Sequence, residues 1–259
     1  MSLQNINMHG KNKTICIAGK NLCAIETLSF VLKKFKDYKI LALPNKSDNG
    51  KDSWQKSFKK FAIRNNVPIT SLKKLYKIEN LYLFSLEYEE ILKVKYFKSN
   101  KLFNFHFSLL PKYRGCHTNF YQILNGEKKT GVTLHEIDKG IDTGKIIDYV
   151  TFPIQINTTA YENYIKLLKK SVFLFKKNIN RILKNNYPKK KQNLKLGNYF
   201  SRKSINYKKL IKFKKIANNI QTHNKIRALI FQPFQLPMIH KKMIKRSIFK
   251  NNKIKLLYL

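Results

Sequence analysis

Three polar side chains between residues 103 and 148 are of the types that acyl transfer requires. Asn104 and His106 stand two residues apart in KLFNFHF, and Asp142 lies in the glycine-rich turn GIDTG. A histidine can take up or release a proton near neutral pH. A carboxylate can hold an imidazole in one tautomer, and an asparagine amide can donate a hydrogen bond to a developing oxyanion. This set indicates transfer of an acyl group through a tetrahedral intermediate.

The attacking nucleophile is expected to come from the substrate. Ser108 and Cys116 are close in sequence, but neither stands in a G-x-S-x-G elbow or has the context of a Cys–His pair. His117 and His135 lack metal-ligand spacing and are interpreted as supporting or structural residues. An Asn-x-His pair alone is most often just the polar face of a strand, so spacing by itself leaves that interpretation open.

The elements expected around these residues alternate between strand and helix. Because side chains alternate along a strand, Asn104 and His106 share one face and the neighbouring phenylalanines share the other. Apolar β-branched or alternating runs predict strands at residues 13–19, 38–44, 67–69, 80–86, 101–107, 129–138 and 145–154. Helical spacing predicts helices at residues 21–35, 57–66 and 159–183, with a short one after the turn at 88–92. The pattern indicates an α/β, Rossmann-like, mostly parallel sheet flanked by helices.

The polar loop NKSDNGKDSWQ (45–55) follows the second expected strand. Ligands of open parallel sheets lie beyond the carboxyl ends of the strands, so Lys51, Trp54 and Gln55 are placed to meet one. The alternative is a solvated loop in which Trp54 anchors the next helix. The first strand ends in a single glycine, Gly19, rather than G-x-G-x-x-G, so the sequence does not favour a bound dinucleotide.

The charge distribution and composition change along the chain. Residues 1–162 carry 26 Lys or Arg and 14 Asp or Glu, whereas residues 163–259 carry 27 Lys or Arg and no acid. The excess indicates either an anionic partner or a compositional bias toward Lys, Asn and Ile, and both interpretations stay open. We predict a main domain over 1–188 and a small accessory lobe over 189–259, with a helix at 214–231 and short strands near 235–238, 243–248 and 254–258.

The cysteines and the hydropathy of the chain indicate which metal sites, disulfides and membrane segments to expect. Cys16, Cys23 and Cys116 form no C-x-x-C pair, so neither a disulfide scaffold nor a tetrahedral zinc site is expected, and no metal is predicted. The start MSLQNINMHGKNK lacks an apolar signal core, and no apolar run reaches the roughly 18 residues of a membrane span. We therefore expect a cytoplasmic protein without a membrane span.

The order N-x-H, SLLPKYRG and GVTLHEIDKGIDTG resembles the folate-dependent formyltransferases over about residues 13–184. That family includes enzymes acting on methionyl-tRNA, on glycinamide ribonucleotide and on nucleotide-linked amino sugars. The resemblance implies the formyltransferase fold, N10-formyltetrahydrofolate as formyl donor, and Asn104, His106 and Asp142 as catalytic residues. It further implies that the folate lies against Ser85, Leu86, Tyr88, Ile91, Thr133, Ile137, Asp138 and Gly140.

The acceptor is indicated by other segments. Four segments look most like enzymes that formylate a dTDP-linked 4-amino- or 3-amino-4,6-dideoxyhexose for O-antigen and lipopolysaccharide synthesis: NGKDSWQ, GVTLHEIDKGIDTGKIID, YFSRKSINY and HNKIRALIFQPFQLP. Two features depart from those enzymes: Asn206 stands where Asp is often found, and no acid follows Glu162. The candidate substrate-binding residues are Lys51, Trp54, Gln55, Ser108, Lys112, Tyr113, Arg114 and Gly115. Aromatic-rich strands in the last 70 residues are compatible with a homodimer.

Two alternatives remain. A methionyl-tRNA formyltransferase is favoured by the basic tail, which could follow a phosphate backbone, and opposed by the lack of length for the C-terminal β-barrel of that family. A non-catalytic RNA-binding protein that kept the fold would have lost the catalytic residues, yet all three are present. Nucleic acid is thus expected as a partner only under the tRNA alternative.

Overall fold

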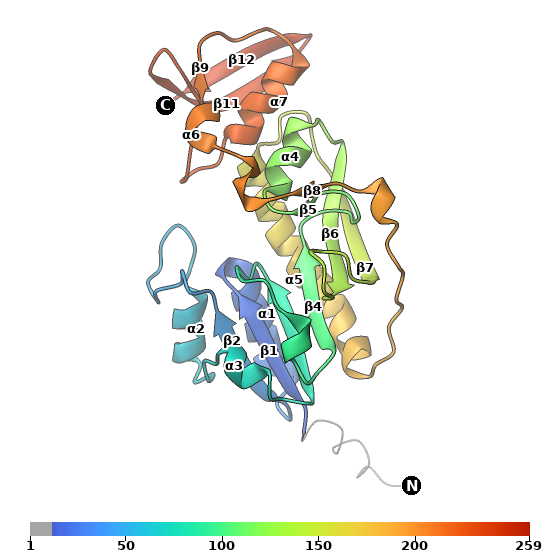
Figure 1. Cartoon of the computed structure of the whole chain (residues 1–259). Helices are drawn as coiled ribbons and strands as arrows, with labels where there is room; N and C mark the ends of the chain where they lie inside the picture. The colour runs from blue at the N-terminus through green and yellow to red at the C-terminus, as the bar shows by residue number, and fades with distance from the viewer. Residues whose placement is uncertain (1–11) are drawn as a thin grey trace. The chain divides into compact units, whose positions relative to one another are not determined.

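The structure is a computed structural model that describes residues 12–259 (Figure 1). Residues 1–11 lie outside the described residues. They include most of the stretch MSLQNINMHGKNK, from which we expect no signal segment. The chain forms two compact units: unit 1 holds residues up to 106, 133–149 and 168–192, and unit 2 holds 107–132, 150–167 and 193–259. The units interleave in sequence, whereas the predicted parts 1–188 and 189–259 are consecutive, so that division stays a prediction.

The central six-stranded sheet has the order β2-β1-β3-β4-β6-β7. Its strands are β1 (Thr14–Gly19), β2 (Lys39–Pro44), β3 (Leu81–Leu86), β4 (Lys101–His106), β6 (Lys129–Glu136) and β7 (Ile146–Pro153). The β1–β2, β1–β3 and β3–β4 pairs are parallel, and β4 pairs antiparallel with β6. The predicted α/β fold with a mostly parallel sheet is confirmed.

Burial explains why the central strands read as continuous apolar runs. Every residue of β1 (TICIAG) and of β3 (LYLFSL) is buried, as expected for parallel strands covered on both faces. One face packs through Phe84 and Phe103, whose rings stack 5.3 Å apart, against Phe175. The other face carries Leu83 and Leu102 into a separate apolar cluster. Because side chains alternate along β4, its phenylalanines lie on one face of the sheet and Asn104 and His106 lie on the other.

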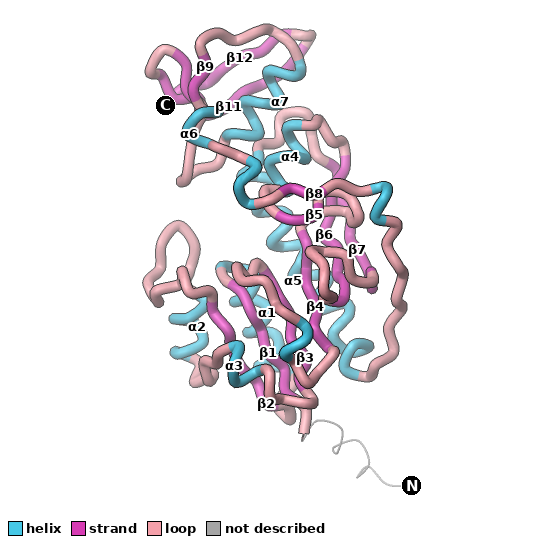
Figure 2. The backbone as a smooth tube through the Cα atoms, in the orientation of Figure 1, coloured by secondary structure: helices cyan, strands magenta, loops and turns pink. Residues whose placement is uncertain are grey.

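Two of the helices that contribute to unit 1 begin at a side-chain cap. These helices are α1 (Asn21–Lys34), α2 (Phe58–Arg64), α3 (Leu72–Leu75) and most of α5 (Ala160–Leu183). The Ser57 hydroxyl accepts from the Lys60 amide and so caps α2. At α5, Thr159 and Glu162 form a reciprocal capping box, in which each side chain accepts the other residue's backbone N–H. Figure 2 shows helix and strand alternating along this part of the chain.

Unit 2 has its own small sheets and apolar clusters. Its elements are β5 (Arg114–Gly115), α4 (Thr118–Leu124), β8 (Tyr199–Phe200), α6 (Tyr207–Leu210), β9 (Lys212–Phe213), α7 (Ile220–Leu229), β10 (Met238–Ile239), β11 (Lys242–Lys250) and β12 (Lys253–Tyr258). A four-stranded sheet has the order β12-β11-β10-β9, and β5 pairs with β8. Helix α7 packs Leu229 with Phe120 of α4, and Ile226 with Ile244 of β11.

Three local predictions were wrong. The expected strand at 67–69 is only an isolated bridge between Ala42 and Ile69, because Pro68 lacks the N–H that a ladder needs. The helix expected over 214–231 begins only at Ile220, where Asn219 caps it by accepting from the Thr222 amide. The short helix after residue 92 is a single 3₁₀ turn, Val94–Tyr96.

Within residues 12–259, no helix combines the length and the apolar character that crossing a bilayer would need.

Candidate active site

Asn104 and His106 lie at the carboxyl end of β4, on the same face as Leu102. In the sheet register Asn104 is level with Ser85 of β3 and with His135 of β6, and His106 is level with Thr133. Phe103 and Phe105 are buried on the opposite face, where Phe103 stacks on Phe84 and Phe105 contacts Phe175. The strand alternation expected from KLFNFHF thus brings the two polar side chains together.

Asp142 reaches both of them from the loop between β6 and β7. Its Oδ2 lies 3.4 Å from Nδ1 of His106, and its Oδ1 lies 3.2 Å from Nδ2 of Asn104. The carboxylate is 12% exposed, so water screens these contacts little. The structure therefore brings together the three residues that sequence reasoning selected.

The loop conformation is set by its own polar groups. Asp138 accepts from the Gly140 amide and from the Thr143 hydroxyl at 3.0 and 2.6 Å. A Cβ on Gly144 would lie 1.7 Å from the Glu136 carbonyl oxygen, so only glycine fits there. The Gln192 amide donates to the carbonyls of Asp142 and Gly144 at 3.0 and 2.7 Å. These contacts hold Asp142 at a φ of 54°, a conformation that disfavours most side chains.

His135 is a fourth member of the cluster. Its Nδ1 lies 2.8 Å from the Glu136 carbonyl, which can only accept, so Nδ1 carries the proton and Nε2 is an acceptor. Nε2 lies 3.2 Å from Nδ2 of Asn104 and 3.5 Å from Oδ1 of Asp142. The side chain is 2% exposed. One feature of the sequence could have indicated that His135 faces the site: Thr133 and His135 alternate with the core residues Val132 and Leu134, so they lie on the opposite face of the strand.

The amide of Asn104 is consequently held at both of its hydrogens. One N–H points to His135 Nε2 and the other to Asp142 Oδ1. A flipped amide would place its carbonyl oxygen against the carboxylate and the imidazole acceptor, which is repulsive, so the chemistry fixes the orientation. In this arrangement Asn104 must release one acceptor before it can donate to an oxyanion.

The residues expected around the folate occupy two segments of unit 1, which belong to the strands on either side of β4 and to the loops that follow them. Ser85 and Leu86 are buried at the end of β3, and Thr133 is buried in β6. Ile91 is 70% exposed, and Ile137 packs partly into the apolar cluster of the sheet. Burial, followed by a hydrogen bond to Glu90, raises the pKa of Tyr88 well above its ordinary value. Asp138 and Gly140 shape the Asp142 loop, and any folate contact by these residues stays a prediction.

The loop at 45–57 is folded on itself. Asp48 accepts from the Ser57 hydroxyl and the Lys59 amide, and Asp52 accepts from the Ser57 amide. Gln55 accepts from the Leu22 amide at 3.2 Å and so caps the first turn of α1. Lys51 is exposed and Trp54 is half-buried. Substrate binding by Lys51, Trp54 and Gln55 stays a prediction.

The other expected substrate residues belong to unit 2. Ser108 is buried, and its hydroxyl donates to the Lys112 carbonyl at 2.7 Å. Tyr113 donates to Glu127 at 2.8 Å, and burial raises its pKa to about 12. Arg114 pairs with Tyr199 through β5 and β8, and its buried Nε has no hydrogen-bond partner within the described part of the chain. Gly115 has a φ of 88°, and a Cβ there would lie 2.2 Å from the Phe200 carbonyl.

Among residues 12–259 no group of three or more His, Cys, Asp or Glu side chains could hold a metal ion. What Asn104, His106, His135 and Asp142 can do together is move a proton and stabilise charge at a reacting carbonyl.

Comparison with known proteins gives one family throughout. A family described as formyl transferase matches residues 83–177. The methionyl-tRNA formyltransferase of Clostridioides difficile is 33% identical over 211 residues, which cover 75% of this chain and 67% of that protein. The chain spans only 28% of the bifunctional polymyxin resistance protein ArnA of Wigglesworthia glossinidia brevipalpis, to which it is 37% identical over 186 residues. It spans 40% of the methionyl-tRNA formyltransferase of Lactobacillus gasseri.

Two solved structures are more similar over greater length. WlaRD, a sugar 3N-formyl transferase crystallised with dTDP and 5-N-formyl-THF, superposes with a TM-score of 0.87 at 48% identity, covering 93% of this chain and 88% of that one. The N-formyltransferase of Helicobacter canadensis, in complex with folinic acid and dTDP-3-aminofucose, also gives 0.87 and 48%, covering 92% and 88%.

Proposed function

The chain belongs to the formyl transferase family, and from this premise we propose that it transfers the formyl group of N10-formyltetrahydrofolate to the amine of a dTDP-linked 3-amino-dideoxyhexose. The observation that carries the choice of acceptor is the 48% identity, over most of both chains, to two sugar N-formyltransferases whose structures hold dTDP or dTDP-3-aminofucose. Structures of 4-N formyltransferases are more distant, at 22% identity for the enzyme of Francisella tularensis.

The side chains of the cluster fit such a transfer. The neutral amine attacks the formyl carbon, forms the new C–N bond and places negative charge on the formyl oxygen. In the proposed transfer His106, whose Nδ1 faces Asp142, donates from Nε2 to that oxygen. Asp142 stabilises the charged imidazole and receives the proton that the amine loses, directly or through water. When the intermediate collapses, the C–N10 bond breaks, and N10 of the folate takes up a proton.

His135 has a positioning role in this proposal. Its Nε2 accepts from Asn104 and thereby keeps the amide plane in the cluster. Because Asp142 accepts the other N–H, a change in the charge of Asp142 during proton transfer alters how firmly the amide is held. Asn104 can thus move one N–H from Asp142 to the oxyanion as Asp142 becomes protonated.

We extend the proposal to the setting of the reaction. The formylated sugar would be used for a surface glycan such as the O-antigen of lipopolysaccharide, and the enzyme would act in the cytoplasm as a homodimer. The support is the similarity to nucleotide-sugar enzymes.

Formylation of methionyl-tRNA is the second candidate. It is supported by the 33% identity to the enzyme of Clostridioides difficile and by the 27 Lys and Arg residues, with no Asp or Glu, after residue 162. Binding of tRNA through phosphate contacts would make the kinetics fall steeply with salt.

A panel assay separates the candidates. The protein is incubated with N10-formyltetrahydrofolate and, in parallel, with dTDP-3-amino, dTDP-4-amino and UDP-4-amino dideoxy sugars and with initiator methionyl-tRNA. We expect tetrahydrofolate release and a formylated product with the dTDP-3-amino sugar. Turnover with the tRNA alone would replace the sugar assignment, and no turnover with any amine would refute formyl transfer.

A further inference from the structure

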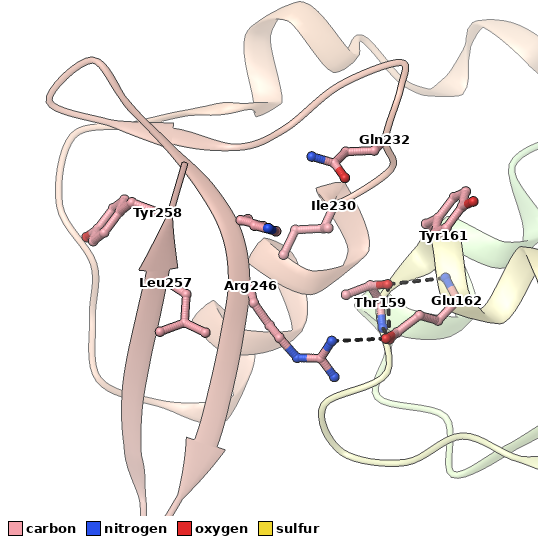
Figure 3. Close-up of a pocket in the computed structure, with 9 residues that line it drawn as sticks. Thr159, Tyr161, Glu162, Ile230, Gln232, Arg246, Leu257 and Tyr258 are labelled. Atoms are coloured by element: carbon pink, nitrogen blue, oxygen red, sulfur yellow. Dashed lines mark hydrogen bonds and ion pairs between the residues drawn. The ribbon is translucent and has the colours of Figure 1, made fainter. Parts of the chain in front are cut away.

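Unit 2 contains a cavity of about 430 Å³ (Figure 3). None of the residues expected to act in catalysis, folate binding or substrate binding lines it. It lies where the start of α5, the turn after α7 and the β11–β12 hairpin meet. Its lining residues are Thr159, Tyr161, Glu162, Ile230, Gln232, Lys245, Arg246, Leu257 and Tyr258. A volume of this order is within the range of about 300–1,000 Å³ that small-molecule sites have.

A β-bulge brings two consecutive cations to this cavity. In the β11–β12 ladder Ile244 is level with Tyr258 and Arg246 is level with Leu257, so Lys245 is the extra residue. In a regular strand Lys245 and Arg246 would point to opposite faces. The bulge cancels that alternation, and both line the cavity.

Glu162, the acidic residue that lines the cavity, already has partners for both of its oxygens. One oxygen of Glu162 lies 3.1 Å from Nη1 of Arg246, and the other accepts from the Thr159 amide and hydroxyl at 2.9 and 3.1 Å (Figure 3). Lys245 has no ion pair within the described part of the chain. No Asp or Glu follows Glu162 in the sequence, so no acidic side chain of the later residues of unit 2 competes for Lys245. The side chains that line the cavity therefore carry one positive charge in excess.

The remaining lining is apolar or neutral. Ile230 is buried, and Leu257 is 40% exposed beside Arg246. The Tyr161 ring is held edge-on by Phe231, with centroids 5.6 Å apart. In Figure 3 the Gln232 amide stands near Ile230, above the Arg246–Glu162 pair. A bound group thus meets both cationic donors and apolar side chains.

We propose that this cavity is a second binding site, for a small organic phosphate with a ring body, of the nucleoside monophosphate class. A phosphate presents several strong acceptor oxygens, which suit the ammonium of Lys245 and the remaining N–H groups of Arg246. The ring body covers Ile230 and Leu257. The proposal rests on this cavity alone and does not depend on the proposed formyl transfer.

Calorimetric titration of the full chain tests it. AMP, ribose 5-phosphate and inorganic phosphate are the probes, each added to the chain alone and, in a second series, after dTDP, which fills the proposed substrate site and competes with AMP for the cavity. We expect AMP to bind one site per chain, more tightly than ribose 5-phosphate, with inorganic phosphate weakest.

Two variants and a control locate the site. Lys245→Gln removes the uncompensated charge and is expected to weaken AMP about tenfold, the effect of losing one charge-assisted hydrogen bond. Leu257→Ser removes apolar surface and is expected to weaken AMP while leaving inorganic phosphate unchanged. Lys253→Gln is the matched control, because Lys253 is exposed on β12 and does not line the cavity. Thermal melts verify that each variant is folded.

The outcomes are decisive. Absence of AMP binding to the wild-type chain, or equal weakening by Lys245→Gln and Lys253→Gln, overturns the site. Equal affinities for AMP and inorganic phosphate overturn the ring-binding part. Failure of dTDP to bind would count against the proposed function alone, because the AMP titration can still be read in its absence.

Discussion

Replacing His135 by phenylalanine tests whether the orientation of Asn104 matters. Phenylalanine fills the volume of a side chain that is 2% exposed, but it removes the Nε2 acceptor 3.2 Å from Asn104 and the Nδ1 donor to Glu136. One of the two N–H groups of the half-buried Asn104 amide then loses its acceptor. Leaving a buried polar group unsatisfied costs about 1–3 kcal/mol, which corresponds to roughly 5- to 150-fold in rate if the cost falls on the transition state.

The assay is steady-state formyl transfer to the sugar nucleotide that the panel identifies. We expect kcat and kcat/KM to fall together by about 10- to 100-fold with little change in KM, because the lost contact orients a reacting group rather than binding substrate. His135→Gln, whose amide oxygen can still accept from Asn104, should recover part of the rate. A folded His135→Phe enzyme with wild-type kcat would refute the reasoning, and a lower rate not rescued by glutamine would indicate a merely structural effect.

Three further predictions concern a charge, a glycine and a buried histidine. Asp142→Asn keeps the shape but removes the charge beside His106, so kcat should fall about 10²-fold or more at unchanged folate affinity; a fall below about threefold would contradict the proton-transfer role. Gly144→Ala forces a Cβ against the Glu136 carbonyl, so activity should be lost while the melting temperature changes by only a few degrees, and a fully active variant would show that the loop tolerates displacement. Burial lowers the pKa of His223 below its ordinary value of about 6.5, so the unfolded state binds the proton more readily and the free energy of unfolding should decrease as the pH falls below about 6.5. Denaturant titrations from pH 7.5 to 5 should show a smaller decrease for His223→Gln than for the wild type, and identical slopes would contradict this.

The strand pattern determined which side chains could meet. Phe103 and Phe105 alternate with Asn104 and His106, and the period of a strand alone places them on opposite faces. Likewise the unbroken apolar runs of β1 and β3 required a sheet covered on both sides, because a strand exposed on one face alternates. These features are local, so the sequence was enough to predict them.

The loop that carries Asp142 was identified by its glycines, but its geometry depends on distant residues. Gln192 holds two of its carbonyls from 48 and 50 residues away. The antiparallel register of β4 and β6 places His135 level with Asn104, and no periodicity within either strand fixes that register. A residue interpreted as supporting thus proved to contact two of the three expected catalytic side chains.

The sequence by itself predicted the fold class and the polar face of β4, because these depend on residue type and short-range alternation, and its resemblance to the formyltransferases supplied the catalytic roles predicted for Asn104, His106 and Asp142. Only the tertiary structure decided that Asn104 gives both N–H groups to His135 and Asp142, and that a bulge places Lys245 beside Arg246. Register and bulges arise from pairing between strands, whose energy comes from contacts far apart in the chain. The physical reason for the difference is therefore the range of the interactions that fix each feature.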